Sequence, residues 1–213
     1  MGYRADEFFV AGTAASYAPE GTADYVTRIV VLRPIDDTAW NGTAIVEWLN
    51  VSGGVDAPPA VWFMAHREIA RAGYAYVVVS AQRVGIEGGL SLVGDASLKK
   101  KLDPQRYSTL SHPGDAFAYD IFTQVGRAIR NGVIDGLAPD VVLAAGGESQ
   151  SATFLTTYVN DVDPDAAVFD GFLIHSRFGS AAPLDGSSLL DESGGRSTPC
   201  RCPSAPTCAR RCS

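Results

Sequence analysis

The sequence predicts an α/β protein in which crossover helices connect the strands of a mostly parallel sheet. Short runs of β-branched and aromatic residues alternate along the chain with segments whose apolar residues have helical spacing. This alternation is typical of parallel strands, because each parallel pair needs a long connection. With 213 residues and a hydrophobic fraction of 46%, the chain is long enough to bury one core of ordinary size.

Six segments are expected to be strands, because they are rich in Val, Ile, Phe and Tyr and are bounded by Gly, Pro or Asp. These segments are residues 7–12, 27–33, 43–49, 74–80, 140–145 and 167–175. The sequence of residues 74–80, YAYVVVS, is a continuous apolar run. Such a run is typical of a strand that is buried on both faces of the sheet.

Three segments between these strands are expected to be helices. Pro59 and Gly73 fit the start and the stop of a helix over residues 60–72. Residues 115–130 and 151–159 have apolar residues at helical spacing. The stretch from residue 82 to residue 114 is polar and rich in glycine, but its glycines lack the G-x-G-x-x-G spacing that follows a strand in dinucleotide-binding proteins. The sequence also contains no P-loop.

The sharpest functional signal is Gly147-Glu148-Ser149-Gln150-Ser151, which lies between an expected strand and an expected helix. A nucleophile elbow needs this context, because its serine occupies a strained turn and its neighbours two residues away must be small. Gly147 and Ser151 meet that requirement around Ser149, with Ser151 in the place where glycine is commonest. The turn also puts Ser149 at a helix N-terminus, which favours an oxyanion. An ordinary turn with a serine helix cap fits the same residues.

The loop Asn50-Val51-Ser52-Gly53-Gly54 follows the strand expected over residues 43–49. A hydrolase elbow takes one oxyanion N–H from a loop at this point of the chain, and small residues let the backbone approach the substrate oxygen. Val51 and Ser52 are the candidate donors from this loop. An ordinary glycine-rich turn is the alternative.

The sequence contains three histidines. His66 lies within an expected helix and is assigned a structural or surface role, and His112 is assigned to a loop or cap. His175 ends the strand expected over residues 167–175, and ligands bind at the carboxyl ends of strands in open α/β sheets. His175 is therefore the weak candidate for a catalytic base, although a triad histidine usually comes from a later loop. Asp170, within the same segment, is expected to be structural.

Five segments in this order resemble the bacterial alpha/beta hydrolase domain family of serine esterases. They are VEWLNVSGG (46–54), AGYAYVVVSAQRVGI (72–86), LDPQRYSTLSHPGDAFAYDIFTQVGRAIR (102–130), GGESQSATFLTTYVN (146–160) and FDGFLIHSR (169–177). The resemblance covers about residues 7–177. It implies an α/β-hydrolase fold with a Ser–acid–His triad that acts on an ester or a related acyl bond. The resemblance places the nucleophile at Ser149 and one oxyanion donor at the N–H of Gln150.

The last 18 residues differ in composition from the rest of the chain. Residues 196–213 carry four arginines, no acid and all four cysteines, whereas residues 1–195 carry 13 basic and 24 acidic groups. The cysteine spacing fits no common zinc site, and a disulfide framework would need an oxidising compartment. We therefore expect residues 1–195 to be a truncated α/β-hydrolase domain that lacks its C-terminal strands. Residues 196–213 are expected to be a disordered basic tail, which a shifted reading frame would explain.

Composition limits the expected partners. A net charge of −7 is a poor match for nucleic acid or an anionic membrane surface, and no apolar run is long enough to span a membrane. The N-terminus does not resemble a signal peptide, so a cytoplasmic location is expected. No metal or other cofactor is required by any motif, and the oligomeric state stays open.

We therefore expect a serine hydrolase that cleaves a small-molecule ester through an acyl-enzyme at Ser149. Because the usual triad acid and histidine have no counterpart in the sequence, we expect little or no activity from this chain. The alternatives are a non-catalytic binding module that keeps the pocket and a non-functional fragment.

Overall fold

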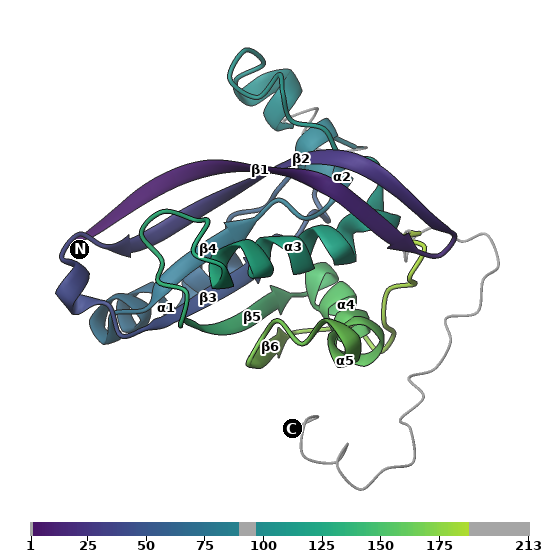
Figure 1. Ribbon diagram of the computed structural model, residues 1–213. Helices are drawn as coiled ribbons and strands as arrows, with labels where there is room; N and C mark the ends of the chain where they lie inside the picture. The colour runs from purple at the N-terminus through teal and green to yellow at the C-terminus, as the bar shows by residue number, and fades with distance from the viewer. Residues whose placement is uncertain (1, 90–96, 188–213) are drawn as a thin grey trace, which may run out of the picture.

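The computed structural model describes residues 2–89 and 97–187 and contains a six-stranded mixed sheet with the order β1-β2-β4-β3-β5-β6 (Figure 1). The predicted α/β class is confirmed. Strands β4, β3, β5 and β6 are parallel to one another, whereas β2 is antiparallel to both β1 and β4. All four cysteines, and the whole of the predicted tail, lie outside the described residues.

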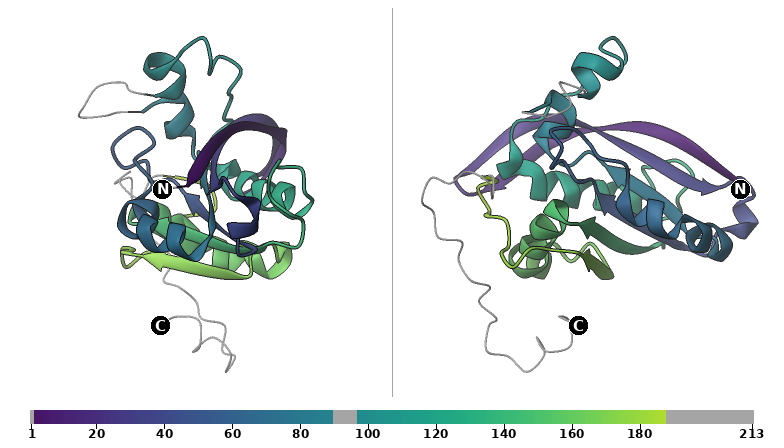
Figure 2. Two further views of the ribbon diagram at one scale, coloured as in Figure 1. Left: turned by 90° about the vertical axis from the view of Figure 1, so that its left-hand side faces the viewer. Right: turned by 180° about the vertical axis from the view of Figure 1, so that it is seen from behind.

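The first two strands form a long antiparallel hairpin that arches over one side of the molecule in Figures 1 and 2. Strand β1 spans Tyr3–Tyr17 and β2 spans Glu20–Pro34, and they pair along their whole length. Both strands are much longer than the segments predicted from apolar runs. The extra residues are partly polar and exposed, because each strand extends beyond the core that gives a strand its apolar pattern.

The four remaining strands form the parallel part of the sheet. They are β3 (Thr43–Trp48), β4 (Ala75–Val79), β5 (Val142–Glu148) and β6 (Gly171–His175). All five residues of β4 are buried, as the continuous apolar run predicts. Strand β6 begins four residues later than predicted, because Asp170 instead makes contacts at the amino end of the strand.

Helices cover both faces of the sheet, as the end-on view in Figure 2 shows. Helix α1 (Ala60–Ala72) packs on one face, where Val61 and Ile69 contact Tyr76 and Val78 of β4. Helices α3 (Ala118–Arg130) and α4 (Gln150–Thr157) pack on the other face. Trp48 of β3 is fully buried there against Phe122 and Phe154.

Shorter helical segments complete the described chain. They are single turns at Asp37–Ala39 and Asp115–Phe117, helix α2 (Arg83–Glu87), π-helical turns at Leu98–Leu102 and Tyr158–Val162, and helix α5 (Asp163–Ala166). Helix α2 and the turn at Leu98–Leu102 fall within the glycine-rich stretch for which no element was predicted. Both are only five residues long, which is too short for apolar periodicity to be visible.

A buried carboxylate holds the start of α1. Pro59 precedes the helix and provides no side-chain cap, but Glu47 of β3 accepts hydrogen bonds from the N–H groups of Ala60 (2.7 Å) and Val61 (3.2 Å). The Tyr76 hydroxyl donates to the second oxygen of Glu47 and accepts from the N–H of Trp62. Burial raises the pKa of Glu47, and these hydrogen bonds oppose that rise.

Candidate active site

Ser149 lies in a sharp turn between β5 and α4, at the carboxyl edge of the parallel strands. Its backbone has φ of 55° and ψ of −115°, which is a strained conformation for any residue except glycine. The N–H of Ser149 donates to the carbonyl oxygen of His175 at 3.0 Å, and α4 begins at the next residue. The N–H of Gln150 is the first of this helix, so it has no acceptor within the helix.

Gly147 and Ser151, the small residues on either side of Ser149, are small for different physical reasons. A Cβ atom on Gly147 would lie 3.1 Å from the backbone oxygen of Ser151 and 3.2 Å from the nitrogen of Ala152, so the start of α4 leaves little room for a side chain. The hydroxyl of Ser151, which is fully buried, donates to the Glu148 carbonyl (2.9 Å) and accepts from the Glu148 N–H (3.0 Å). Ser151 therefore connects the two sides of the turn, which glycine could not do.

The Asn50–Gly54 loop contacts the turn that holds Ser149. The Asn50 amide donates to the Glu148 carbonyl at 3.1 Å and lies 3.3 Å from a carboxylate oxygen of Glu148. The N–H of Ser52 donates to the side chain of its neighbour Asn50 at 2.8 Å. The N–H of Val51 instead points across to the turn and donates to the Gln150 carboxamide oxygen at 3.3 Å. Of the two candidate oxyanion donors in the loop, the N–H of Val51 is therefore the one directed toward Gln150, the residue after Ser149.

Two residues near this site, Gln82 and Asp115, were not singled out from the sequence. The carboxamide oxygen of Gln82, which follows β4, accepts from Gln150 Nε2 at 3.1 Å and from Trp48 Nε1 at 3.2 Å. Gln82 in turn donates to Asp115 at 3.1 Å. Neither residue belongs to a short motif, and they meet only because β3, β4 and β5 end at the same edge of the sheet.

His175 is adjacent to Ser149 through its backbone. Its imidazole Nδ1 lies 3.1 Å from the hydroxyl of Ser176, and this is the one side-chain hydrogen bond that the imidazole makes within the described chain. Asp170 binds the Arg130 guanidinium and the N–H of Leu143 at the other end of β6, in keeping with its expected structural role.

The other two histidines contact the backbone. His66 Nδ1 lies 3.2 Å from the carbonyl oxygen of Trp62 on its own helix. His112 is buried, and its Nε2 lies 2.9 Å from the Ala81 carbonyl while its Nδ1 accepts from the Gly114 N–H. Because Nδ1 accepts, Nε2 carries the proton and the ring is neutral; burial lowers its pKa.

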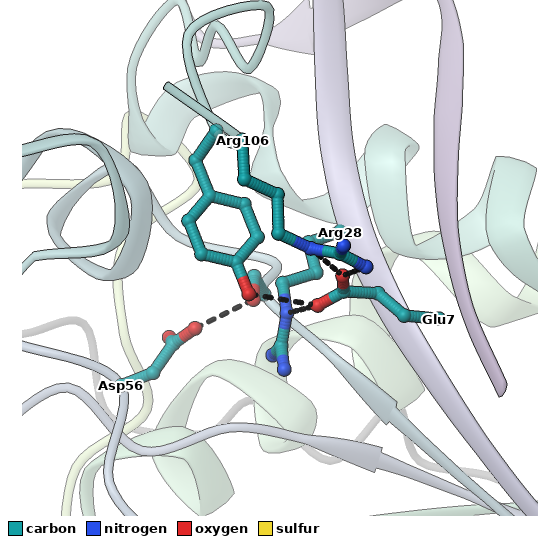
Figure 3. A network of polar contacts seen from close by, with 6 residues as sticks. Glu7, Arg28, Asp56 and Arg106 are labelled. Carbon is teal, nitrogen blue, oxygen red and sulfur yellow. Dashed lines mark hydrogen bonds and ion pairs between the residues drawn. The ribbon is translucent and has the colours of Figure 1, made fainter. Parts of the chain in front are cut away.

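A second polar cluster lies along the same edge of the sheet, nearer to the hairpin (Figure 3). The carboxylate of Glu7 receives Arg28 from β2, Arg106 and the Tyr107 hydroxyl. Burial raises the pKa of Glu7, but the hydrogen bonds from Arg28 and Arg106 outweigh it, so the pKa lies below its usual value. These contacts connect the β1–β2 hairpin to the segment around residue 106.

Asp56 is half-buried beside this cluster, in the connection between β3 and α1. Its Oδ2 accepts from the Ser80 hydroxyl at 2.5 Å, whereas its Oδ1 is buried without a hydrogen-bond partner among the described residues. A Cβ atom on Gly85 would lie 1.9 Å from Oδ1, so a side chain at residue 85 would force Asp56 to move. Burial raises the pKa of Asp56 to about 6, although Ser80 and the charge of Arg28 favour ionisation.

A cavity of about 310 Å³ lies at the opposite edge of the sheet from Ser149. Its walls come from segments that precede β3 and β5 and from the end of β2: Arg33, Pro34, Asp37, Trp40, Gly136, Leu137 and Ala138. In the part of the chain that the structure describes, no cluster of three or more His, Cys, Asp or Glu side chains could hold a metal ion. No helix there is long and apolar enough to cross a membrane.

Solved structures with a similar fold share little sequence identity with this chain. Prolyl oligopeptidase B from Galerina marginata shares 11% identity at a TM-score of 0.50, over 84% of this chain and 21% of that one. The esterase Est22 shares 10% identity at a TM-score of 0.49, over 84% and 46% of the two chains. Brefeldin A esterase, a bacterial homologue of human hormone sensitive lipase, shares 14% identity at a TM-score of 0.44, over 83% of this chain and 42% of that one.

The family model of the alpha/beta hydrolase domain matches residues 1–206. This match is longer than the range of about 7–177 expected from the sequence resemblance, and it includes Cys200 and Cys202 of the basic segment. No protein of curated function matches the chain. The chain spans less than half the length of the three structures named above. Since the family model covers nearly the whole sequence, the chain belongs to the alpha/beta hydrolase domain family.

Proposed function

We propose that this chain is a serine hydrolase that cleaves a carboxylic ester of a small molecule through an acyl-enzyme at Ser149. The observation that carries the proposal is the strained backbone of Ser149 between β5 and α4, with φ of 55°. A fold maintains such strain when the conformation serves a purpose, and an elbow of this kind exposes the serine oxygen above the sheet. Family membership and the adjacent Asn50–Gly54 loop support the same reading.

The proposed reaction has two steps. The Ser149 oxygen attacks the ester carbonyl carbon, its proton passes to a base, and the alcohol leaves with a proton, so that an acyl-serine ester remains. Water then attacks that ester, the carboxylic acid leaves, and Ser149 recovers its proton. In both steps the negative oxygen would accept hydrogen bonds from the N–H groups of Gln150 and Val51.

His175 is the base candidate among the described residues. Its backbone carbonyl accepts a hydrogen bond from the N–H of Ser149, but its imidazole contacts the Ser176 hydroxyl. None of the three imidazoles is hydrogen-bonded to a carboxylate within residues 2–89 and 97–187. A serine hydroxyl without an oriented base is a weak nucleophile, so we propose that hydrolysis by this chain is slow.

Hydrolysis of p-nitrophenyl acetate tests the proposal. We expect slow release of p-nitrophenol with a covalent acetyl group on Ser149, detected by mass spectrometry of the intact chain, and loss of both in Ser149→Ala. Release that is unchanged by Ser149→Ala would overturn the proposal. His175→Gln tests the base: a loss similar to that in Ser149→Ala assigns proton transfer to this imidazole, and an unchanged rate removes it from the mechanism.

A non-catalytic binding module is the second candidate. The observations that favour it are the absence of a carboxylate partner for any described imidazole and the occupied N–H of Val51. A rise in melting temperature with a non-hydrolysed ester, without acetylation of Ser149, would favour this second function.

A further inference from the structure

The N–H of Val51 is the first donor in a chain of amides that ends at Asp115. Val51 donates to Gln150 Oε1 at 3.3 Å, and Gln150 Nε2 donates to Gln82 Oε1 at 3.1 Å. Gln82 Nε2 then donates to Asp115 Oδ2 at 3.1 Å. Every bond runs in the same direction, from the loop after β3 toward the carboxylate.

The direction of this chain is set by groups that have only one hydrogen-bonding role. The indole N–H of Trp48 is a donor and cannot accept, so the Gln82 atom that faces it at 3.2 Å must be the oxygen. Gln150 must then turn its NH₂ group toward Gln82 and its oxygen toward Val51. The Asp115 carboxylate only accepts, and it is held at its other oxygen by the Arg83 N–H at 2.7 Å.

Burial makes this arrangement rigid. Trp48 is fully buried and Gln82 is 1% exposed, so neither side chain is able to exchange its partners for water. A buried amide group without a hydrogen-bond partner is destabilised by the full free energy of its desolvation. The one orientation that satisfies every group is therefore favoured. Gln150 itself is half-buried, and the hydrogen bond from its Nε2 to the buried Gln82 turns its carboxamide oxygen toward the N–H of Val51.

This carboxamide oxygen has the same chemistry as the carbonyl oxygen of a substrate. We propose that Gln150 is a built-in occupant of the oxyanion site, which an ester must displace from the Val51 N–H before its own carbonyl oxygen binds there. Gln82 is a positioning residue, because it acts through Gln150 and does not itself touch the substrate. The inference rests on the proposed function, since it assigns the Val51 N–H to the substrate oxygen.

The Gln150 carboxamide competes with the substrate oxygen for the Val51 N–H, and it competes best against oxygens that are weak hydrogen-bond acceptors. An amide oxygen accepts a hydrogen bond more strongly than an ester oxygen, so ester binding in the ground state loses part of its gain to the displacement of Gln150. The charged oxygen of the tetrahedral intermediate competes better, because hydrogen bonds to a charged acceptor are about twice as strong. Removing the Gln150 amide should therefore act mainly on KM.

Two readouts test the inference. In Gln150→Met, which keeps the length of the side chain, we expect the ¹H–¹⁵N signal of Val51 to move upfield and its amide exchange to accelerate. We expect KM for p-nitrophenyl acetate to fall about fivefold, the value of one neutral hydrogen bond, with a smaller change in kcat. Gln150→Glu keeps an acceptor for Val51 but loses the donor to Gln82; its carboxylate should hold the Val51 signal downfield and raise KM. Gln105→Met, at an exposed position, is the matched control and should change neither readout.

Gln82→Met tests the positioning role, with its melting temperature measured to confirm that it folds. The Val51 signal should move in the same direction as in Gln150→Met, although Gln82 does not contact Val51. If Gln82→Met fails to fold, Asp115→Asn tests the same chain from its acceptor end. A Val51 signal that stays in place in Gln150→Met would overturn the inference whether or not the chain hydrolyses esters.

The kinetic outcomes separate this inference from the proposed function. If Ser149→Ala abolishes turnover and the Val51 signal moves, but KM is unchanged in Gln150→Met, displacement is wrong and the proposed function stands. If wild-type turnover is absent or insensitive to Ser149→Ala, the proposed function fails and displacement fails with it. The signal of Val51 still decides the contact in that case.

Discussion

The backbone N–H of Ser149 donates a hydrogen bond of 3.0 Å to the carbonyl oxygen of His175. This bond continues the β5–β6 ladder by one residue beyond Glu148, which pairs with His175 in the parallel register. Ser149 is therefore held by the sheet through its own N–H while α4 begins at its carbonyl side. The two attachments keep its backbone at positive φ and explain why the strain does not relax.

Replacing Ser149 by glycine should stabilise the fold relative to alanine. Alanine keeps the Cβ atom that makes φ of 55° unfavourable, whereas glycine adopts this conformation readily. We expect Ser149→Gly to be more stable than Ser149→Ala by about 1 kcal/mol, measured by urea unfolding. Equal midpoints and slopes for the two variants would show that the turn is not strained.

Loss of the Ser151 hydroxyl should destabilise the turn around Ser149. The hydroxyl is buried and makes two hydrogen bonds to the backbone of Glu148, so Ser151→Ala leaves both of these groups without that partner. The expected loss is about 2 kcal/mol in the free energy of unfolding. Ser108→Ala is the matched control: its hydroxyl makes an exposed bond to the Gln105 carbonyl, and the expected change is within about 0.5 kcal/mol. Similar losses in both variants would contradict the prediction.

Glu47→Ala should be among the most destabilising single substitutions. Glu47 is 1% exposed, and its carboxylate accepts from the first two N–H groups of α1, for which Pro59 offers no substitute. We expect a loss of about 3 kcal/mol, because the variant leaves buried donors without an acceptor. Glu47→Gln keeps one oxygen for Ala60 and Val61 and should lose about 1 kcal/mol. Chemical denaturation near pH 7 measures both values, and a glutamine variant as unstable as the alanine variant would exclude a capping role.

Asp56 should make the protein less stable as the pH rises. Burial raises its pKa to about 6 in the folded state, against 3.8 for the unperturbed carboxyl, so the folded state binds the proton more tightly than the unfolded state. The stabilisation from this proton is complete below about pH 4 and is lost as the pH rises to about 6. The difference in pKa corresponds to at most about 3 kcal/mol.

Asp56→Asn removes this dependence, because asparagine does not titrate. We expect the difference in unfolding free energy between pH 4 and pH 7 to shift in favour of pH 7 in the variant, measured by urea unfolding at several pH values. Asp135→Asn, at an exposed position, is the control that leaves the profile of the wild type in place. A profile in Asp56→Asn that matches the wild type would show that this carboxyl titrates alike in both states.

Local patterns predicted the elements that lie in the centre of the sheet. The expected helix over residues 60–72 is α1 without change of bounds, and residues 74–80 contain β4. These segments are buried on well-defined faces, so burial leaves a strong apolar pattern in the sequence. The length of the hairpin was missed, because strands that extend beyond the core need no such pattern.

The sequence by itself determined the α/β class, the family resemblance and the candidate nucleophile. The spacing of small residues around Ser149 is local, since a turn with positive φ constrains only its near neighbours. The contacts of that turn are not local: Val51, Gln82 and Asp115 come from three separate connections, and neither Gln82 nor Asp115 has a recognisable motif. Only the tertiary structure decided that they meet, because parallel strands end at a common edge and bring distant connections together. There the one-way roles of the Trp48 indole and the Asp115 carboxylate set the orientation of Gln150.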